Sequence, residues 1–300
     1  MKVNRNIKAK PFVKWAGGKS QLLYEVSRSL PVEMAERKDI TYIEPFVGGG
    51  AVLFWILQEF PNIEHAVIND INKELICTYT VIKNDVENLI MALSEYNSEY
   101  QSLDELARKD YFLTKRARYN ECPECDVEIA ALFIFLNRTC FNGLYRVNSK
   151  GKFNVPFGRY AAPNICDSAT LRADSELLQR VTILCGDFEQ TECYANERAV
   201  FYFDPPYKPI TDTSSFTSYS MGGFDDVDQV RLRNFCDRIA ARKALFVASN
   251  SDPERDSVAG NFFDRIYDRY SIRRVSASRI INANAAGRGK LSEVIITNIV

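Results

Sequence analysis

A strand, a glycine turn, a helix and a second strand follow one another over residues 41–70. TYIEPF (41–46) is rich in β-formers, Gly48-Gly49-Gly50 forms a turn, AVLFWILQEF (51–60) predicts a buried helix, and EHAVIND (64–70) predicts a buried strand. This order is typical of a βαβ unit, in which a crossover helix joins two parallel strands. The feature restricts the chain to α/β folds with a parallel sheet.

Further elements continue the same alternation. Strands are expected at 181–186, 199–204, 244–249 and 291–300, and helices over 73–118 and around 226–242. Residues 137–165 differ, because Asn, Gly and Pro recur there without a sustained period. We therefore predict a doubly wound, mostly parallel α/β domain formed by 1–70 and 166–300, interrupted by a helical, basic insertion at 71–165.

The charges are sorted along the chain, although 38 basic and 39 acidic residues nearly cancel. Residues 1–24, 129–166 and 269–292 contain six, five and six basic residues, and none of the three segments contains an acid. If the fold brings these segments together, they form a positive surface suited to a polyphosphate partner. The Asn, Gly and aromatic residues interleaved in 137–160 favour a nucleic acid over an ordinary solvated surface.

Composition excludes other classes of protein. The sequence has no run of about 18 apolar residues that predicts a membrane span, and its basic N-terminus lacks the apolar core of a signal peptide. Eight Cys scattered over 300 residues then predict reduced thiols in a cytoplasm. Cys122 and Cys125 form a single C-x-x-C pair, which we interpret as a free-thiol turn rather than a zinc site. The single His, His65, argues against a histidine base or a histidine-rich metal site, and we expect no metal.

The glycine turn is suited to a nucleoside cofactor. Asp70 lies 20 residues past Gly50, at the end of the second strand, where a carboxylate accepts hydrogen bonds from ribose hydroxyls. The dinucleotide fingerprint fails, because Leu53 stands where its third glycine is required. A cofactor without a pyrophosphate is therefore favoured over NAD or FAD, and a tight turn with no ligand is the competing interpretation.

A second motif predicts the chemistry. Asp204-Pro205-Pro206-Tyr207 follows the buried run 199–203, at the edge of the sheet where ligands of open α/β folds bind. The two prolines fix a rigid, extended turn. Asp204 and the Pro205 carbonyl can accept the two N–H groups of an amine conjugated to a heteroaromatic ring, and Tyr207 can stack on that ring. A strand-ending turn with an incidental Asp is the alternative.

These motifs, taken together, resemble the DNA adenine-N6 methyltransferases of the Dam type, the D12 class. The resemblance is carried by FVKWAGGK (12–19), EPFVGGG (44–50), ND (69–70) and FDPPY (203–207), and NGLYRVNSKGKFNVPFGRY (142–160) is similar to the family's DNA-reading segment. It extends from about Pro11 to the C-terminus. It implies a Rossmann-like class I methyltransferase domain with a C-terminal antiparallel strand, and a target-recognition domain at 71–165.

The resemblance also implies a reaction and its residues. A methyl group would pass from S-adenosylmethionine to N6 of an adenine flipped out of double-stranded DNA, with GATC as the expected target. Catalysis is assigned to Asp204, Pro205, Pro206 and Tyr207. The cofactor is assigned to Trp15, Lys19, Glu44, Phe46, Gly48, Asp70 on the ribose, Asp187 and Phe188 on the adenine, and Asp204. DNA contacts are assigned to Lys14, Arg138, Phe141, Asn142, Leu144, Arg146, Pro156 and Arg159, of which Arg146 can bond a guanine edge bidentately.

Three alternatives are compatible with these motifs. The same chemistry can act on cytosine N4 or on adenine in RNA, and a catalytically silent DNA-binding protein can keep the fold. Asp204 favours DNA adenine, because cytosine-N4 enzymes more often carry Ser or Thr at this position and RNA enzymes often carry Asn. We expect a cytoplasmic protein, bacterial or phage-encoded, that is associated with the nucleoid through DNA and has no membrane contact or obligate protein partner. A place in a restriction-modification system and an orphan role are both compatible with the sequence.

Overall fold

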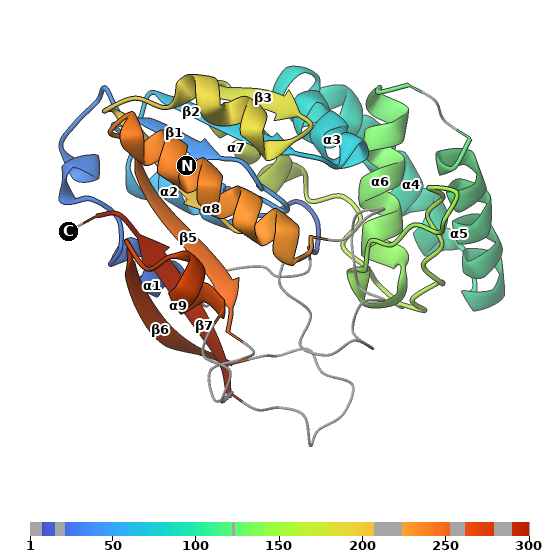
Figure 1. The fold of residues 1–300 in the computed structure, drawn as a ribbon. Helices are drawn as coiled ribbons and strands as arrows, with labels where there is room; N and C mark the ends of the chain where they lie inside the picture. The colour runs from blue at the N-terminus through green and yellow to red at the C-terminus, as the bar shows by residue number, and fades with distance from the viewer. Residues whose placement is uncertain are drawn as a thin grey trace. The chain divides into compact units, whose positions relative to one another are not determined.

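Two compact units make up the chain. The computed structural model describes residues 8–15, 22–121, 124–206, 224–252, 262–278 and 290–299 (Figure 1). Unit 1 consists of Met1–Gly18, Gly48–Glu59 and Asp70–Gly186, and unit 2 consists of Lys19–Val47, Phe60–Asn69 and Asp187–Val300. None of the helices within the described ranges is long and apolar enough to cross a membrane.

Seven strands form a single sheet. They are β1 (Thr41–Glu44), β2 (His65–Asp70), β3 (Val181–Cys185), β4 (Ala199–Phe203), β5 (Leu245–Ser251), β6 (Ser271–Ser278) and β7 (Lys290–Thr297), in the spatial order β3-β2-β1-β4-β5-β7-β6. β1 pairs in parallel with β2 and β4, and β4 pairs in parallel with β5. β7 runs antiparallel to β5 and β6. The prediction of a mostly parallel, Rossmann-like sheet with a C-terminal antiparallel strand is confirmed.

The helices of unit 2 are α1 (Leu23–Ser27), η1 (Val32–Ala35), η3 (Phe188–Tyr194), α8 (Asp226–Ala241) and α9 (Phe262–Ile266). α8 begins at a capping box, in which the Asp225 carboxylate accepts from the N–H groups of Val227 and Asp228. It lies over the parallel strands of its own unit (Figure 1). Phe235 of α8 packs edge-on against two rings of β4, those of Phe201 and Phe203, at 6.1 and 5.9 Å. This buried aromatic contact fixes the helix on the strand that leads into Asp204-Pro205-Pro206, the DPP turn.

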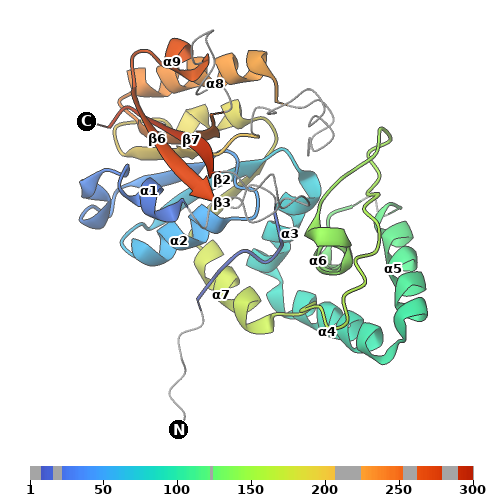
Figure 2. The same ribbon diagram turned by 90° about the horizontal axis from the view of Figure 1, so that it is seen from below.

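Unit 1 is mainly helical. Its helices are α2 (Ala51–Glu59), α3 (Lys73–Asn84), α4 (Val86–Ser102), α5 (Glu105–Tyr119), α6 (Val127–Thr139), η2 (Phe141–Gly143) and α7 (Ser168–Leu178). α6 contacts α3, α4 and α5 (Figure 2). Ten of the 13 residues of α6 are buried, which identifies it as the centre of the helical core. The division of functions between 71–165 and the rest of the chain stays a prediction.

A disulfide bond corrects one expectation. Cys77 of α3 is bonded to Cys125, which precedes α6, and their Cα atoms lie 5.5 Å apart. The interpretation of Cys125 as part of a free-thiol turn, and of all thiols as reduced, is therefore wrong. The reason is tertiary, because the packing of α3 on α6 brings together two cysteines that are 48 residues apart in the sequence. Cys122 lies outside the described residues.

Candidate active site

The glycine turn follows β1 and precedes α2. Gly48 and Gly50 have φ values of 49° and 77°, in the left-handed region that favours glycine. A Cβ atom at Gly48 or Gly49 would lie 2.9 Å from the Trp15 side chain, and one at Gly50 would overlap the Tyr79 hydroxyl oxygen. Two aromatic side chains therefore require three successive glycines at this turn.

Asp70 is fixed beneath the turn. One carboxylate oxygen accepts the Gly48 N–H at 3.0 Å and the other accepts the Asn72 N–H at 2.9 Å. Burial raises the pKa of Asp70, and backbone donors from Asn72, Gly48 and Ile71 partly offset this rise. A carboxylate has about four acceptor positions, so these bonds leave acceptor capacity for ribose hydroxyls. Because the Gly48 N–H is directed to Asp70, it is not presented to a phosphate, in agreement with the absent dinucleotide fingerprint.

Trp15 connects the glycine turn to the helical core of unit 1. Its ring stacks on Tyr145 with centroids 5.5 Å apart, and it lies 6.2 Å from the ring of Phe133 in α6. Trp15, which packs on Gly48 and Gly49, therefore also contacts Tyr145, near the start of the segment 142–160 that is predicted to read DNA. Lys19, the other N-terminal residue assigned to the cofactor, lies outside the described residues.

In unit 2, β1 ends at Glu44, and Phe46 follows two residues later. Glu44 is buried, and its carboxylate accepts from the Tyr42 hydroxyl at 3.0 Å. Phe46 is half-buried, and its ring lies 5.2 Å from that of Phe188 and 5.7 Å from that of Phe224, the latter at 90°. Three phenylalanines from separate parts of unit 2 thus form one aromatic cluster, which suits the flat face of a purine.

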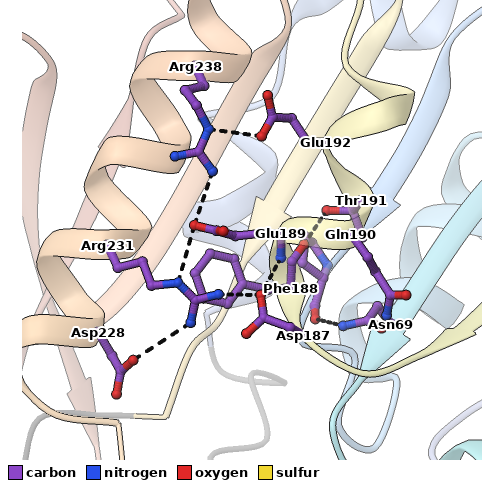
Figure 3. Close-up of polar contacts among 11 residues, drawn as sticks. Asn69, Asp187, Phe188, Glu189, Gln190, Thr191, Glu192, Asp228, Arg231 and Arg238 are labelled. Carbon is purple, nitrogen blue, oxygen red and sulfur yellow. Dashed lines mark hydrogen bonds and ion pairs between the residues drawn. The ribbon is translucent and has the colours of Figure 1, made fainter.

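Asp187 and Phe188 begin η3 (Figure 3). Asp187 caps this helix, since its Oδ1 accepts the Glu189 N–H at 2.9 Å, and the same oxygen accepts from the Arg231 guanidinium. Burial opposes ionisation of Asp187, but the hydrogen bonds from Arg231 and from the Glu189 N–H outweigh it, so the pKa of Asp187 is lowered. Asp187 is therefore an exposed, ionised acceptor beside a buried ring.

The DPP turn begins directly after β4. Asp204 is partly exposed, Pro205 is buried and Pro206 is exposed. The Ser249 hydroxyl lies 3.5 Å from an Asp204 carboxylate oxygen, and the Gln229 amide donates to the Pro206 carbonyl at 3.4 Å. Ser249 and Gln229 come from β5 and α8, so two neighbouring elements hold the turn in place. Tyr207 lies outside the described residues.

The segment assigned to DNA is largely exposed. Backbone bonds fold it back on itself, with Val147 bridged to Phe153 and the Asn154 N–H donating to the Arg146 carbonyl at 3.1 Å. Seven of the eight residues assigned to DNA have exposed side chains: Lys14, Phe141, Asn142, Leu144, Arg146, Pro156 and Arg159. Arg138 differs, because its guanidinium is partly buried and donates to the Phe12 carbonyl at 2.7 Å. Its assignment to DNA stays a prediction.

Four residues that contact the predicted site residues carried no signal in the sequence: Phe224, Gln229, Arg231 and Ser249. Each lies 23 or more residues from the site residue that it contacts, and none belongs to a recognisable motif. Their positions depend on how α8 and β5 pack beside β4, which a local pattern does not encode.

Comparisons with known proteins agree with this geometry. Residues 15–281 match the family described as D12 class N6 adenine-specific DNA methyltransferase. The chain is 46% identical over 295 residues to the type II methyltransferase M.MjaIII of Methanocaldococcus jannaschii, a match that covers 97% of this chain and 100% of that protein. It is 38% identical over 299 residues to the type II methyltransferase M1.LlaDCHI of Lactococcus lactis subsp. cremoris, covering 97% and 96%. It is 34% identical over 289 residues to a DNA adenine methylase of Vibrio cholerae, covering 96% and 95%.

The relatives match 96–97% of the chain, and the family match at 15–281 contains the motifs at 44–50, 69–70, 142–160 and 203–207. They select DNA adenine over the cytosine and RNA alternatives, and an enzyme over a silent DNA-binding protein. A reaction of this kind requires a methyl donor and DNA. The chain belongs to the D12 class of N6 adenine-specific DNA methyltransferases.

Proposed function

We propose that the protein transfers the methyl group of S-adenosylmethionine to N6 of adenine within GATC sites of double-stranded DNA. The observation that carries this proposal is the DPP turn, in which a carboxylate and a carbonyl stand next to each other at the end of β4, held by residues of β5 and α8. S-adenosylmethionine, when bound, supplies a sulfonium-activated methyl group.

Asp204 and Pro205 act on the target amine. The adenine N6 lone pair is delocalised into the ring, so the amine is a poor nucleophile. Hydrogen bonds from its two N–H groups to the Asp204 carboxylate and the Pro205 carbonyl favour a pyramidal nitrogen with its lone pair directed at the methyl carbon. S-adenosylmethionine, when bound, would supply the methyl carbon: its S–C bond would break to leave a neutral thioether as the N–C bond forms, and the proton that N6 loses would pass to water. Positioning and electrostatics then supply most of the rate enhancement.

The described residues fit the cofactor by their chemistry. Asp70 retains acceptor capacity for the ribose hydroxyls, Asp187 is an ionised acceptor for the adenine amino group, and Phe46 and Phe188 provide aromatic surface. Trp15, Lys19, Glu44, Gly48 and Asp204 complete the proposed set. This assignment is supported by the donors and acceptors present within each unit.

Recognition of the DNA sequence is assigned to the exposed hairpin within residues 142–160. Arg146 presents its guanidinium to solvent, as a bidentate contact to guanine in the major groove requires. Leu144 and Pro156 offer apolar contact to a thymine methyl group, and Phe141, 51% exposed, is available to enter the stack. Flipping the adenine costs a few kcal/mol of unstacking, and stacking on Tyr207 would offset about 1–3 kcal/mol. Similarity of 142–160 to the Dam-type reading segment supports GATC as the site.

The test is methyl transfer from labelled S-adenosylmethionine to unmethylated duplexes that differ only in the presence of GATC, followed by nucleoside analysis. We expect N6-methyladenine in GATC duplexes alone, and loss of transfer in Asp204→Ala with an unchanged melting curve. Methylated adenine in other sequences would overturn GATC as the target but would still support methyl transfer to adenine N6. Near-normal transfer by Asp204→Ala would overturn the role of the DPP turn.

A further inference from the structure

Arg231 of α8 meets both residues that begin η3 (Figure 3). Its Nη2 donates to Asp187 Oδ1, and its guanidinium carbon lies 4.5 Å from the centre of the Phe188 ring. The same guanidinium pairs with Glu189 at 3.2 Å and lies 3.9 Å from an oxygen of Asp228. One side chain thus contacts the ionised acceptor and the aromatic ring that we assign to the cofactor's adenine.

We propose that Arg231 is a positioning residue for adenine recognition, which holds the Asp187 carboxylate and the Phe188 ring in the arrangement that reads the amino group and the ring face of the cofactor. This inference rests on the proposed use of S-adenosylmethionine. Arg231 itself makes no contact with the cofactor in this proposal and acts only through its two neighbours.

The hydrogen bonds of Asp187 explain how the positioning works. Oδ1 accepts from two donors, the Glu189 N–H and Arg231, which fixes the plane of the carboxylate. Oδ2 receives no hydrogen bond from any residue that the structure describes, so it is left for a ligand. An adenine amino group donates to such an oxygen, whereas a hypoxanthine presents a carbonyl oxygen at the same place and is repelled.

Besides Phe46 and Phe224, two side chains of α8 hold the Phe188 ring. Arg231 lies over its face, and Phe235 packs against it at 5.5 Å and 90°. A guanidinium that stacks on an aromatic face and bonds a carboxylate with the same planar group cannot be replaced by an ammonium without losing one of the two contacts. The arrangement therefore uses a property specific to arginine.

The neighbouring arginine provides a matched control. Arg238, two turns farther along α8, pairs with Glu189 at 3.0 Å and with Glu192 at 2.9 Å (Figure 3). It joins the same helix to η3, and its guanidinium lies 5.3 Å from the centre of the Phe235 ring. Within the described part of the chain, it forms no hydrogen bond or ion pair with Asp187 and no cation–π contact with Phe188. A role of Arg231 that is limited to joining α8 to η3 would be reproduced by Arg238.

The experiment measures the affinity of the full chain, without DNA, for S-adenosylhomocysteine and for S-inosylhomocysteine, by calorimetry. We expect the wild-type protein to prefer the adenosyl compound, and Arg231→Met to lower this preference about tenfold, as loss of a charge-assisted hydrogen-bond geometry implies. Arg238→Met should leave the preference unchanged. Arg231→Lys should restore only part of it, and melting curves of each variant report its folding.

Several outcomes would overturn the inference. One is an Arg231→Met protein that prefers S-adenosylhomocysteine as strongly as the wild-type protein does. Another is an Arg238→Met protein that loses as much of this preference as Arg231→Met. If Arg231→Met does not fold, full discrimination in Arg231→Lys would count against it in the same way. A wild-type protein that binds neither compound would overturn the cofactor assignment and the inference that rests on it, and this result is distinct from binding without discrimination.

Discussion

Arg146 is exposed, yet its guanidinium is already oriented. Its Nε–H donates to the Asn154 side-chain oxygen at 2.7 Å and one Nη2–H donates to the Asn154 carbonyl at 3.3 Å. Arginine has five N–H donors, so both hydrogens of Nη1 and one of Nη2 stay available at the far edge. That edge is the one that bonds a guanine end-on. Because Asn154 restricts the rotamers of Arg146, less side-chain entropy would be lost in the proposed recognition of guanine.

Asn154→Ala should therefore weaken site discrimination without abolishing transfer. Loss of one hydrogen bond to a charged group predicts about 1.5 kcal/mol less discrimination between GATC and singly substituted sites, against about 1–3 kcal/mol for Arg146→Ala. The measurement is kcat/KM on the paired duplexes. Asn148→Ala is the control, since the Asn148 side chain accepts from the Lys150 and Lys152 N–H groups and forms no hydrogen bond with Arg146 among the described residues.

A double-mutant cycle separates positioning from a general loosening of the hairpin. If Asn154 acts through Arg146, Asn154→Ala should have no further effect on discrimination in an Arg146→Ala background. Additive losses would show that Asn154 contacts DNA independently, and the positioning role would be abandoned.

At the scale of elements, the disulfide fastens α3 to the start of α6. Its removal frees a loop that spans 48 residues. The chain-entropy treatment gives about 4 kcal/mol for such a loop, and a disulfide typically contributes about 2–4 kcal/mol of folding free energy. Cys125→Ser should therefore unfold at a lower denaturant concentration than the wild-type protein, and reductant should lower the wild-type midpoint to a similar value. Cys193→Ser, at an exposed free thiol, is the matched control.

Reductant should then have no effect on the Cys125→Ser midpoint. Wild-type midpoints that coincide with and without reductant, in protein whose free-thiol count shows the bond to be broken, would contradict the prediction. The same count without reductant also reports whether the bond forms in the purified protein.

Helices and strands with a clear apolar pattern were predictable from the sequence, and their predicted ends lie close to the observed ends. The helix expected at 51–60 is α2 at Ala51–Glu59, and the strand expected at 199–204 is β4 at Ala199–Phe203. α6 gave no such pattern, because it is buried almost all round and has no polar face to mark a helical period. β6 is a polar edge strand that pairs only with β7, and its sequence SIRRVSAS lacks an apolar alternation.

The residues of the candidate site also differ in how far the sequence predicted them. Asp70, Asp187 and Asp204 stand at strand ends next to local signals, namely a glycine turn, a strand followed by a short helix, and a proline pair. Their supporting residues, such as Arg231 and Ser249, come from elements far along the chain. Motifs therefore point to the groups that we propose react or bind the cofactor, whereas the hydrogen bonds that orient these groups could be found only from the fold.

At the scale of the molecule, the three basic segments, 1–24, 129–166 and 269–292, make different contacts. The first two meet within unit 1, where Asn137 bonds both the N–H and the carbonyl of Lys14 at 2.8 Å, and the Lys14 ammonium lies 5.0 Å from the centre of the Tyr160 ring. In the third segment, Arg273 pairs with Glu25 and Arg274 with Asp252 and Asp264, all in unit 2. Two of its cations are therefore committed to ion pairs within the fold, and unit 1 holds the exposed basic residues assigned to DNA.

Unit 1 also contains a buried acid that links its N-terminal segment to α7. Asp174 is fully buried, and one of its oxygens accepts the Lys10 N–H at 3.0 Å. The other oxygen has no partner within the described part of the chain. Burial raises the pKa of Asp174 to about 8, and the Lys10 N–H opposes this rise only in part. Near neutral pH the folded protein therefore keeps this carboxyl largely protonated.

Asp174 makes folding stability fall as pH rises. The folded chain binds one more proton than the unfolded chain between the unfolded pKa, about 4, and the folded pKa, about 8. Over that window the free energy of unfolding loses about 1.4 kcal/mol per pH unit. Asp174→Asn keeps an acceptor for Lys10 and does not titrate. We therefore expect its stability relative to the wild-type protein to increase steadily from pH 5 to pH 8.

Denaturant unfolding of both proteins across this range measures the difference, and Asp167→Asn serves as an internal contrast. Burial opposes ionisation of Asp167, but its hydrogen bonds with Thr170 and Lys10 outweigh it and lower its pKa. Asp167 therefore stabilises the fold above its unfolded pKa and loses this effect as pH falls, so Asp167→Asn should be most costly at neutral pH and least costly in acid. Parallel pH profiles for Asp174→Asn and the wild-type protein would mean that Asp174 does not titrate within this window, and its buried carboxyl would then require a partner beyond the Lys10 N–H.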